Sequence, residues 1–136
     1  MVVEIAAHPT RVWRALTVPA EVARWDGVVP TAVPDDYPVV GQHARWRTKI
    51  GFLGLTLHDR VRVVDEERCL ASTIDVGIVH VEERYTLEAT AAGTRLTSDN
   101  EVRSRLPGLG RLALRLGASG VRSSMARLVT HCETPA

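Results

Sequence analysis

The stretch HPTRVWRALTVPAEVARWDG, residues 8–27, holds two of the chain's three tryptophans and two prolines, each proline standing where a helix can begin. Proline suits the first turn of a helix because its missing N–H would have no helical partner there. Pro19 also disfavours helix at the residue before it. The stretch therefore predicts two short consecutive helices, the first ending near Thr17 and the second running from Pro19 to a glycine cap at Gly27.

Both predicted helices are too short to be stable alone, so packing against other elements must hold them. Val12, Trp13 and Leu16 follow helical spacing on one face of the first helix. Val22 and Trp25 share one side of the second helix. We therefore expect Trp13 and Trp25 to be buried and to close the fold, with Trp25 also a candidate for a pocket wall.

Period-two alternation of apolar and polar residues indicates β-structure on both sides of the helical stretch. VVEIAA (2–7) predicts a short strand before it, and 29–35, which contains two prolines, predicts at best an edge strand. Five further strands are expected at 42–50, 55–64, 69–76, 79–89 and 94–103. The links between them are short, which predicts hairpins and an antiparallel meander.

The C-terminal region carries an apolar stripe at helical spacing, which predicts one long helix over roughly 108–132. A sheet with one apolar face needs a cover, and this helix is the only long candidate. With 136 residues, 45% of them apolar and 24% charged, the chain is expected to form a single domain over 1–136. The expected class is α+β, with the elements in the order β-α-α-β6-α.

Alternation followed through consecutive hairpins assigns each side chain of the meander to one face. A two-residue turn at 77–78 places Ser72 opposite Glu83, and a four-residue turn at 90–93 places Glu83 opposite Asn100. The apolar side chains of these strands then stay on one side throughout.

The earlier hairpin is expected to turn at GFLG (51–54), which pairs Ile50 with Leu55 and Trp46 with Asp59. With this register the outer face of the meander is charged. Positive and negative side chains on neighbouring strands predict surface ion pairs, each of which contributes little to stability. Its members are Arg45, Arg47, Lys49, His58, Arg60, Arg62, Asp75, His80, Glu82, Arg84, Glu88, Arg95, Asp99 and Glu101.

The inner face is apolar with a few exceptions, which are Thr48, Asp59, Ser72, Glu83, Tyr85, Ser98 and Asn100. A buried carboxylate is costly unless it is paired or hydrogen-bonded, so Asp59 and Glu83 are the most informative residues. One interpretation is that a bulge turns one of them outward, or that an arginine of the last helix pairs with it. The other is a polar band inside a cavity, where a carboxyl group of raised pKa exchanges protons.

Because the chain reverses at every hairpin, successive connections between strands lie at alternate ends of the sheet. GFLG (51–54), the turn at 77–78 and RLPGLG (105–110) share one end, which is glycine-rich and apolar, while 65–68 and 90–93 share the other, which is polar. Exposed apolar loops with glycines suit the mouth of a pocket for an apolar ligand. The alternative is that these loops pack against the final helix.

Three stretches resemble the START-like (SRPBCC) superfamily, and within it the polyketide cyclase/dehydrase and lipid-transport group. They are IAAHPTRVWRALTVPAEVARW (5–25), ERYTLEATAAGTRLT (83–97) and LPGLGRLALRLGASGVRSSMARLVTHCE (106–133). The resemblance implies a helix-grip fold, in which a curved antiparallel sheet wraps around the long C-terminal helix. It also implies a cavity between sheet and helix for a hydrophobic ligand, and it supplies no shared catalytic motif.

The function expected first is therefore binding of a small hydrophobic molecule, lipid or polyketide-like, in that cavity. The candidate ligand-binding residues are Trp46, Leu57, Ser72, Ile74, Val81, Tyr85, Ser98, Asn100, Leu112 and Leu116. The alternative is a cyclase or dehydratase in which Asp59 or Glu83 is the general acid or base. The sequence leaves open whether the protein is an enzyme.

A third interpretation rests on charge, because residues 103–136 hold six arginines and one glutamate. Arg111, Arg115 and Arg122 share one face of the predicted final helix, which suits an anionic membrane or partner surface. A solvated helix face explains the same pattern.

Several classes of function are not expected. The five histidines are scattered and no HExxH or CxxC motif exists, so neither a metal site nor a cofactor is predicted. Nucleic-acid binding is not expected, since all three tryptophans are predicted to be internal. No apolar run is long enough to span a membrane, and no signal peptide is recognisable.

The remaining predictions concern the setting of the protein. Cys69 and Cys132 are expected to be buried thiols in a reducing cytoplasm rather than a disulfide. Sixteen of the 17 cationic residues are arginine, which suggests a bacterial source with a GC-rich genome. The protein is expected to be a monomer or a homodimer.

Overall fold

The computed structural model describes the backbone of residues 1–50, 52–106, 108 and 110–135, and their side chains except those of 50 and 110–119. The helices in this part of the chain are α1 (Pro9–Thr17), α2 (Pro19–Trp25) and α3 (Gly110–Glu133). The strands are β1 (Val2–Ile5), β2 (Val29–Ala32), β3 (His43–Ile50), β4 (Leu53–Asp65), β5 (Cys69–Val76), β6 (Val79–Thr90) and β7 (Gly93–Ser104). This confirms the predicted order β-α-α-β6-α.

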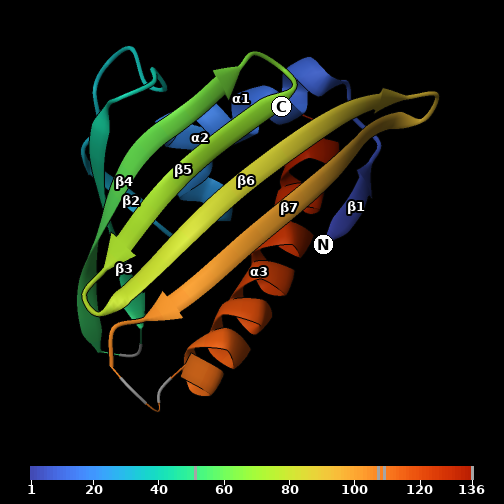
Figure 1. Ribbon diagram of the computed structural model, residues 1–136. Helices are drawn as coiled ribbons and strands as arrows, with labels where there is room; N and C mark the ends of the chain where they lie inside the picture. The colour runs from blue at the N-terminus through green and yellow to red at the C-terminus, as the bar shows by residue number, and fades with distance from the viewer. Residues whose placement is uncertain (51, 107, 109, 136) are drawn as a thin grey trace.

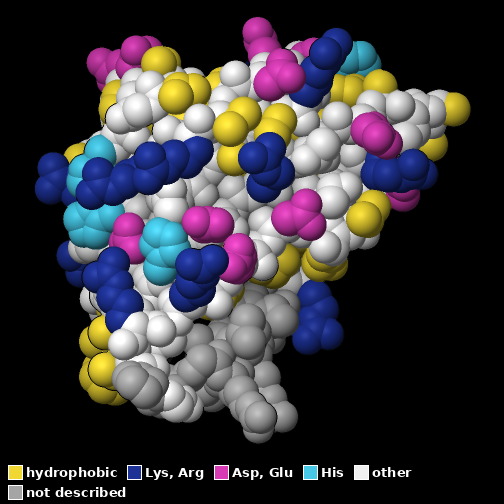
Figure 2. All heavy atoms as spheres, in the orientation of Figure 1, with side chains coloured by type: hydrophobic (Ala, Val, Ile, Leu, Met, Phe, Trp, Pro, Cys, Tyr) yellow, Lys and Arg dark blue, Asp and Glu magenta, His cyan; other side chains and the backbone are white. Residues whose placement is uncertain are grey.

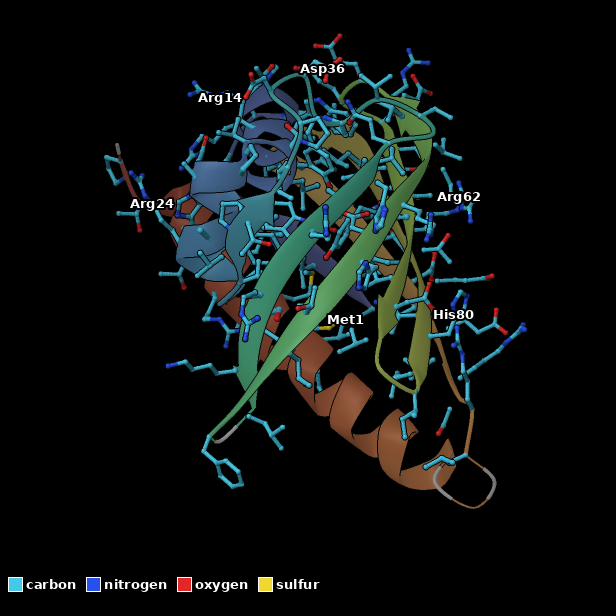
Figure 3. All side chains as sticks on the ribbon, turned by 90° about the vertical axis from the view of Figure 1, so that its left-hand side faces the viewer. Met1, Arg14, Arg24, Asp36, Arg62 and His80 are labelled. Atoms are coloured by element: carbon cyan, nitrogen blue, oxygen red, sulfur yellow. The ribbon has the colours of Figure 1, made fainter. Side chains whose placement is uncertain are left out.

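All the strands form one antiparallel sheet in the order β1-β7-β6-β5-β4-β3-β2. The sheet is curved, and α3 crosses one face of it while α1 and α2 cover the same face (Figure 1). Figure 3 shows the same layering from the side, with Arg14 and Arg24 on the helical side and Arg62 and His80 on the opposite side of the sheet. The helices therefore enclose the inner face, and the outer face is left to solvent.

The predicted register of the later hairpins is confirmed. Ser72 pairs with Glu83, and Glu83 pairs with Asn100. The link at 90–93 is tighter than the four-residue turn expected, because Thr90 pairs with Gly93. The shortening is symmetrical about the turn, so the register and the faces are unchanged.

The predicted register of the β3–β4 hairpin is wrong by two residues. Ile50 pairs with Leu53 rather than Leu55, and the partner of Trp46 is Leu57 rather than Asp59. β4 begins at Leu53, inside the stretch expected to form the turn. Because side chains alternate with a period of two, an even displacement leaves Asp59 on the inner face.

The tryptophans of the two short helices are buried as predicted, Trp13 being 8% and Trp25 3% exposed. The indole N–H of Trp25 donates to the carbonyl of Ala15 at 2.7 Å and so ties α2 to α1. These helices share one apolar cluster with Met125 and Leu128 of α3, which are almost fully buried. Burial therefore stabilises helices whose length alone would not.

The cysteine prediction is correct only in part. Both thiols are free, and Cys132 is buried in the cluster that α3 shares with α1 and α2. Cys69, at the start of β5, is only partly buried and lies within 3.1 Å of the guanidinium of Arg84.

Glu21 joins all three helices at one point. This glutamate of α2 is 8% exposed and accepts hydrogen bonds from Arg11 of α1 and from Nε2 of His131 of α3, the latter at 3.0 Å. Arg11 also donates to the backbone carbonyl of His131 at 3.3 Å. Burial alone would raise the pKa of Glu21, but the hydrogen bonds from Arg11 and His131 outweigh it and lower the pKa below its ordinary value.

The variant Glu21→Gln is expected to lose about 1–2 kcal/mol of unfolding free energy at pH 7, because Arg11 would keep only a neutral acceptor. A carboxylate whose pKa is lower folded than unfolded stabilises above its unfolded pKa. That contribution disappears as the pH falls through the folded pKa. The gap between wild type and variant should therefore close below the ordinary value of 4.5. Urea unfolding between pH 3 and pH 7 measures it.

The matched control is Glu4→Gln, which removes a pair with Arg95 of 2.6 Å whose side chains are both largely exposed. Exposed pairs contribute little, so this variant should unfold as the wild type does. An equal loss in both variants, or a loss in Glu21→Gln that does not change with pH, would show that the Glu21 contacts are not the cause.

Candidate functional site

A cavity lies between the inner face of the sheet, the segment that follows α2, and α3. It consists of a larger hollow of about 270 Å³ and a smaller one of about 50 Å³. The two hollows share a wall and together form the inner cavity. The shared wall is made by Asp26, Val28, Leu57, Ile74, Glu83 and Tyr85.

Most of the predicted ligand-binding side chains line this cavity. Trp46 and Ser72 line the smaller hollow, and Val81, Ser98 and Asn100 line the larger. Leu57, Ile74 and Tyr85 line both. The side chains of Leu112 and Leu116 lie outside the described residues. That any of these residues contacts a ligand stays a prediction.

Asp59 points into the smaller hollow from β4 and is 5% exposed. Its Oδ2 accepts hydrogen bonds from the hydroxyl of Tyr37 at 2.8 Å and from the indole N–H of Trp46 at 3.2 Å. The strand irregularity between Val61 and Val63 lies beyond it and does not turn it outward. Neither a bulge nor, among the described residues, a pair with an arginine of α3 therefore explains this carboxyl group.

The other carboxyl oxygen of Asp59, Oδ1, is buried and makes no well-formed hydrogen bond with the described residues. Burial raises the pKa of Asp59, and hydrogen bonding by Tyr37, Ser72 and Trp46 offsets only part of the rise. Asp59 is thus a buried acid, one of whose two carboxyl oxygens has no well-formed hydrogen bond among the described residues.

Glu83 of β6 lies deep in the fold but is reached by some solvent, because it lines both hollows. Burial, followed by the nearby carboxyl groups of Asp26 and Asp59, raises the pKa of Glu83 to about 8. The hydroxyl of Tyr85 hydrogen-bonds to Glu83 and lowers that pKa in part. A carboxyl group in this state is able both to hold and to release a proton near neutral pH.

Asp26 is a third cavity carboxyl group, at the residue that caps the C-terminal end of α2. Burial raises its pKa to about 6, against a hydrogen bond with Ser124 and the positive charge of Arg127, both on α3. Asp26, Asp59 and Glu83 thus come from three separate segments and meet in one cavity.

Sequence reasoning missed Asp26 and Tyr37. Asp26 stands between Trp25 and Gly27, where a polar residue is expected at the end of a helix and carries no sign of burial. Tyr37 lies in the segment between β2 and β3, which has no periodicity. Its ring meets that of Trp46 edge to face, with centroids 5.7 Å apart. Only the three-dimensional closure of this segment over the sheet reveals its role.

The apolar end of the meander is exposed. Phe52 is 96%, Leu53 54% and Ile78 43% exposed. Figure 1 places the ends of β3, β5 and β7 and the start of α3 together at the lower end of the sheet. The larger hollow is lined by Thr48, Val76 and Val102, which stand near the strand ends on this side. Residues 51, 107 and 109 of the two loops lie outside the described residues, and that this end forms the mouth of the cavity stays a prediction.

The outer face of the sheet is charged as predicted (Figure 2). His80 hydrogen-bonds to Asp75 at 2.8 Å, and Arg105 lies 3.3 Å from the same carboxylate. Side-chain interactions on the outer face also include a 2.6 Å hydrogen bond from Arg62 to Thr73. These contacts are local and lie on the side of the sheet away from the inner cavity.

Three further features concern metal binding, membrane spans and the arginines of α3. No group of three or more histidine, cysteine, aspartate or glutamate side chains there is placed to hold a metal ion. Within the same part of the chain, no helix combines the length and apolar character needed to cross a bilayer. Of the arginines proposed for a membrane or partner surface, Arg122 is exposed, and the side chains of Arg111 and Arg115 lie outside the described residues. That surface stays a prediction.

Solved structures share the fold over nearly the whole chain. Protein CV1439 from Chromobacterium violaceum superimposes with a TM-score of 0.80 at 18% identity, covering 99% of this chain and 96% of its own. Protein MLL2253 from Mesorhizobium loti gives 0.76 at 23% identity, covering 96% and 93%. These similarities establish the fold alone.

DynU16, a protein in the dynemicin biosynthetic locus, superimposes with a TM-score of 0.74 at 26% identity over 98% of this chain. The present chain spans only 46% of DynU16. A search among curated proteins found no match.

A family model described as "Polyketide cyclase / dehydrase and lipid transport" matches residues 1–133. That match and the curved sheet around α3 agree with the resemblance seen in the sequence and with the helix-grip fold it implied. The chain therefore belongs to the polyketide cyclase/dehydrase and lipid transport family.

Proposed function

We propose that the protein binds a compact, mainly apolar small molecule with one polar group in the inner cavity. The observation that carries this proposal is the cavity itself, whose wall combines apolar side chains with a few carboxyl and hydroxyl groups. Sites for drug-sized ligands measure about 300–1000 Å³. The larger hollow, about 270 Å³, lies just below that range and favours a compact ligand over a long acyl chain.

The proposal is tested by filling the cavity. In Val81→Trp the indole would occupy the larger hollow, which the Val81 side chain lines. Small apolar compounds with one polar group should raise the melting temperature of the wild type, because a ligand that binds only the folded state stabilises it. Val81→Trp should lose that shift.

The control is Glu82→Trp, which places the same side chain on the neighbouring position of β6, where the residue is exposed. It should respond to the compounds as the wild type does. Circular dichroism first establishes that both variants are folded. A folded Val81→Trp protein that binds the compounds as tightly as the wild type would overturn the proposal.

A second candidate function, acid–base catalysis on the bound molecule, is favoured by one observation, the pKa of about 8 for Glu83 inside the cavity. A group that titrates near the working pH is the best acid–base catalyst. The family description and the place of DynU16 in a biosynthetic locus support this candidate. Its test is turnover of a bound compound. Glu83→Gln should abolish turnover while leaving binding in place, and Asp59→Asn tests the other carboxyl group in the same way.

A further inference from the structure

We propose, resting on the small-molecule site proposed above, that the ligand is a compact organic cation whose protonated amine lies among Asp26, Asp59 and Glu83. The inference concerns the chemical class of the ligand, which neither the fold nor the family description specifies. Charge, hydrogen bonding and shape each point to it.

Among the described residues, the cavity wall has acidic side chains and no lysine or arginine. Asp26, Asp59 and Glu83 all line the smaller hollow, and no lysine or arginine side chain among the described residues lines either hollow. The charge of Arg127 on α3 bears on Asp26. The guanidinium of Arg127 already donates hydrogen bonds to the carbonyl of Trp25 at 2.7 Å and to the hydroxyl of Ser124 at 3.2 Å. Desolvated carboxyl groups without a partner are costly, so a cationic ligand would complement this wall.

The hydrogen-bond inventory points the same way. Tyr37 and Trp46 both donate hydrogen bonds to Oδ2 of Asp59. The buried Oδ1 of Asp59 lacks a partner among the described residues. In the larger hollow, Asn100 donates to the hydroxyl of Ser98 at 3.0 Å. The neutral donors beside Asp59 are thus already used, and its Oδ1 is left as a buried acceptor without one. An amine carries the donors this wall needs, whereas a carbonyl ligand would bring a further acceptor.

The shape of the cavity fits a cation with an apolar body. Four aromatic residues line the smaller hollow: Trp25, Tyr37, Trp46 and Tyr85. Aromatic faces attract cations, most strongly where water is excluded. The smaller hollow, about 50 Å³, suits a group the size of an ammonium. The larger hollow, lined by Ile74, Val76, Val81 and Val102 among others, would take the apolar body.

The test is a matched set of probes that differ only in the head group: phenethylamine, its neutral analogue 2-phenylethanol, and the anion phenylacetate. Calorimetry at pH 7 should give a Kd for the amine about tenfold or more below that for the alcohol. Phenylacetate should not bind, because its charge would meet three acidic groups. The cavity-filled Val81→Trp should bind none of them.

The proton balance supplies a second readout. In the free protein Glu83 faces Asp26, Asp59 and Tyr85, and Tyr37 and Arg127 stand behind them. Binding of a cation favours the ionised form of Glu83, whose pKa is about 8 when free. The amine should therefore release protons at pH 7, which calorimetry in two buffers of different ionisation enthalpy measures, and the alcohol should not.

Two variants and a control separate the local effect from overall charge. Asp59→Asn and Glu83→Gln should each reduce the preference for amine over alcohol. Asp99→Asn removes the same formal charge from an exposed position on β7 and should leave it unchanged. If the alcohol binds as tightly as the amine and Val81→Trp abolishes both, the cation inference is wrong while the small-molecule site stands. If none of the probes and no screened compound binds the wild type, both proposals fail.

Discussion

An alanine at position 93 is expected to cost about 3 kcal/mol or more of unfolding free energy and to detach β1 from the sheet. Gly93 begins β7 with a φ of 148°, a value that disfavours any side chain. A Cβ built there would lie 2.2 Å from the carbonyl oxygen of Ile5 and 2.8 Å from the amide nitrogen of Ala7. Both atoms belong to backbone that Thr94 also holds, through a 2.7 Å hydrogen bond to the carbonyl of Ala7. Neither side can move without breaking the β1–β7 pairing.

Chemical unfolding of Gly93→Ala, compared with Gly41→Ala, measures this effect. Gly41 also has positive φ, 92°, but a Cβ added there would meet nothing within 4 Å. Its alanine variant should therefore lose only the conformational term of about 1–2 kcal/mol. Hydrogen exchange should show the amides of β1 losing protection in Gly93→Ala alone. Similar losses in the two variants would mean that the close approach of β1 is not what Gly93 protects.

The variant Glu83→Gln is expected to be more stable than the wild type at pH 9, by about 2–4 kcal/mol. Burial and the neighbouring carboxyl groups raise the pKa of Glu83 from 4.5 to about 8. An acid whose pKa is higher folded than unfolded binds more protons when folded, so stability is lost as the pH rises between these two values. Glutamine cannot ionise and avoids that loss, and it keeps the size of the side chain.

Thermal unfolding from pH 5 to pH 9 tests this sign. The two proteins should melt at similar temperatures near pH 5 and diverge as the pH rises. Glu82→Gln, the exposed neighbour on β6, should follow the wild type at every pH. A wild type whose stability does not fall relative to Glu83→Gln between pH 5 and pH 9 would show that Glu83 is not held protonated by its surroundings. A group kept at such a cost in stability is typical of a functional site.

The faces of the sheet could be predicted because side chains alternate strictly between the two faces of a strand. Ser72, Glu83 and Asn100 were placed together from alternation and turn length, and the structure pairs them in that way. On β3 and β4 the stretch GFLG allowed more than one turn, so the register was wrong by two residues. Asp59 still fell on the inner face, since an even slip does not change which side a residue faces.

The rest of the site could not be predicted because it depends on segments without periodicity. Tyr37 reaches Asp59 from a connection between strands, and neither spacing nor composition indicates which side chains of such a segment turn inward. Asp26 looks like any polar residue at the end of a helix. Its hydrogen bond with Ser124 and the nearby charge of Arg127 come from α3, about 100 residues further along the chain. The sequence therefore predicted the wall that the strands supply, and missed the part supplied by the segments that close over it.

The order of the strands has a consequence for how the chain is made. Both edge strands, β1 and β2, come from the first 32 residues, yet they stand at opposite ends of the sheet. The β2 strand meets its partner β3 soon after it leaves the ribosome. The β1 strand must wait, because Met1 hydrogen-bonds to Ser98, 97 positions away. At a synthesis rate of about 5–20 residues per second, β1 remains unpaired for roughly 5–20 s, its apolar residues open to chaperones or to a neighbouring nascent chain.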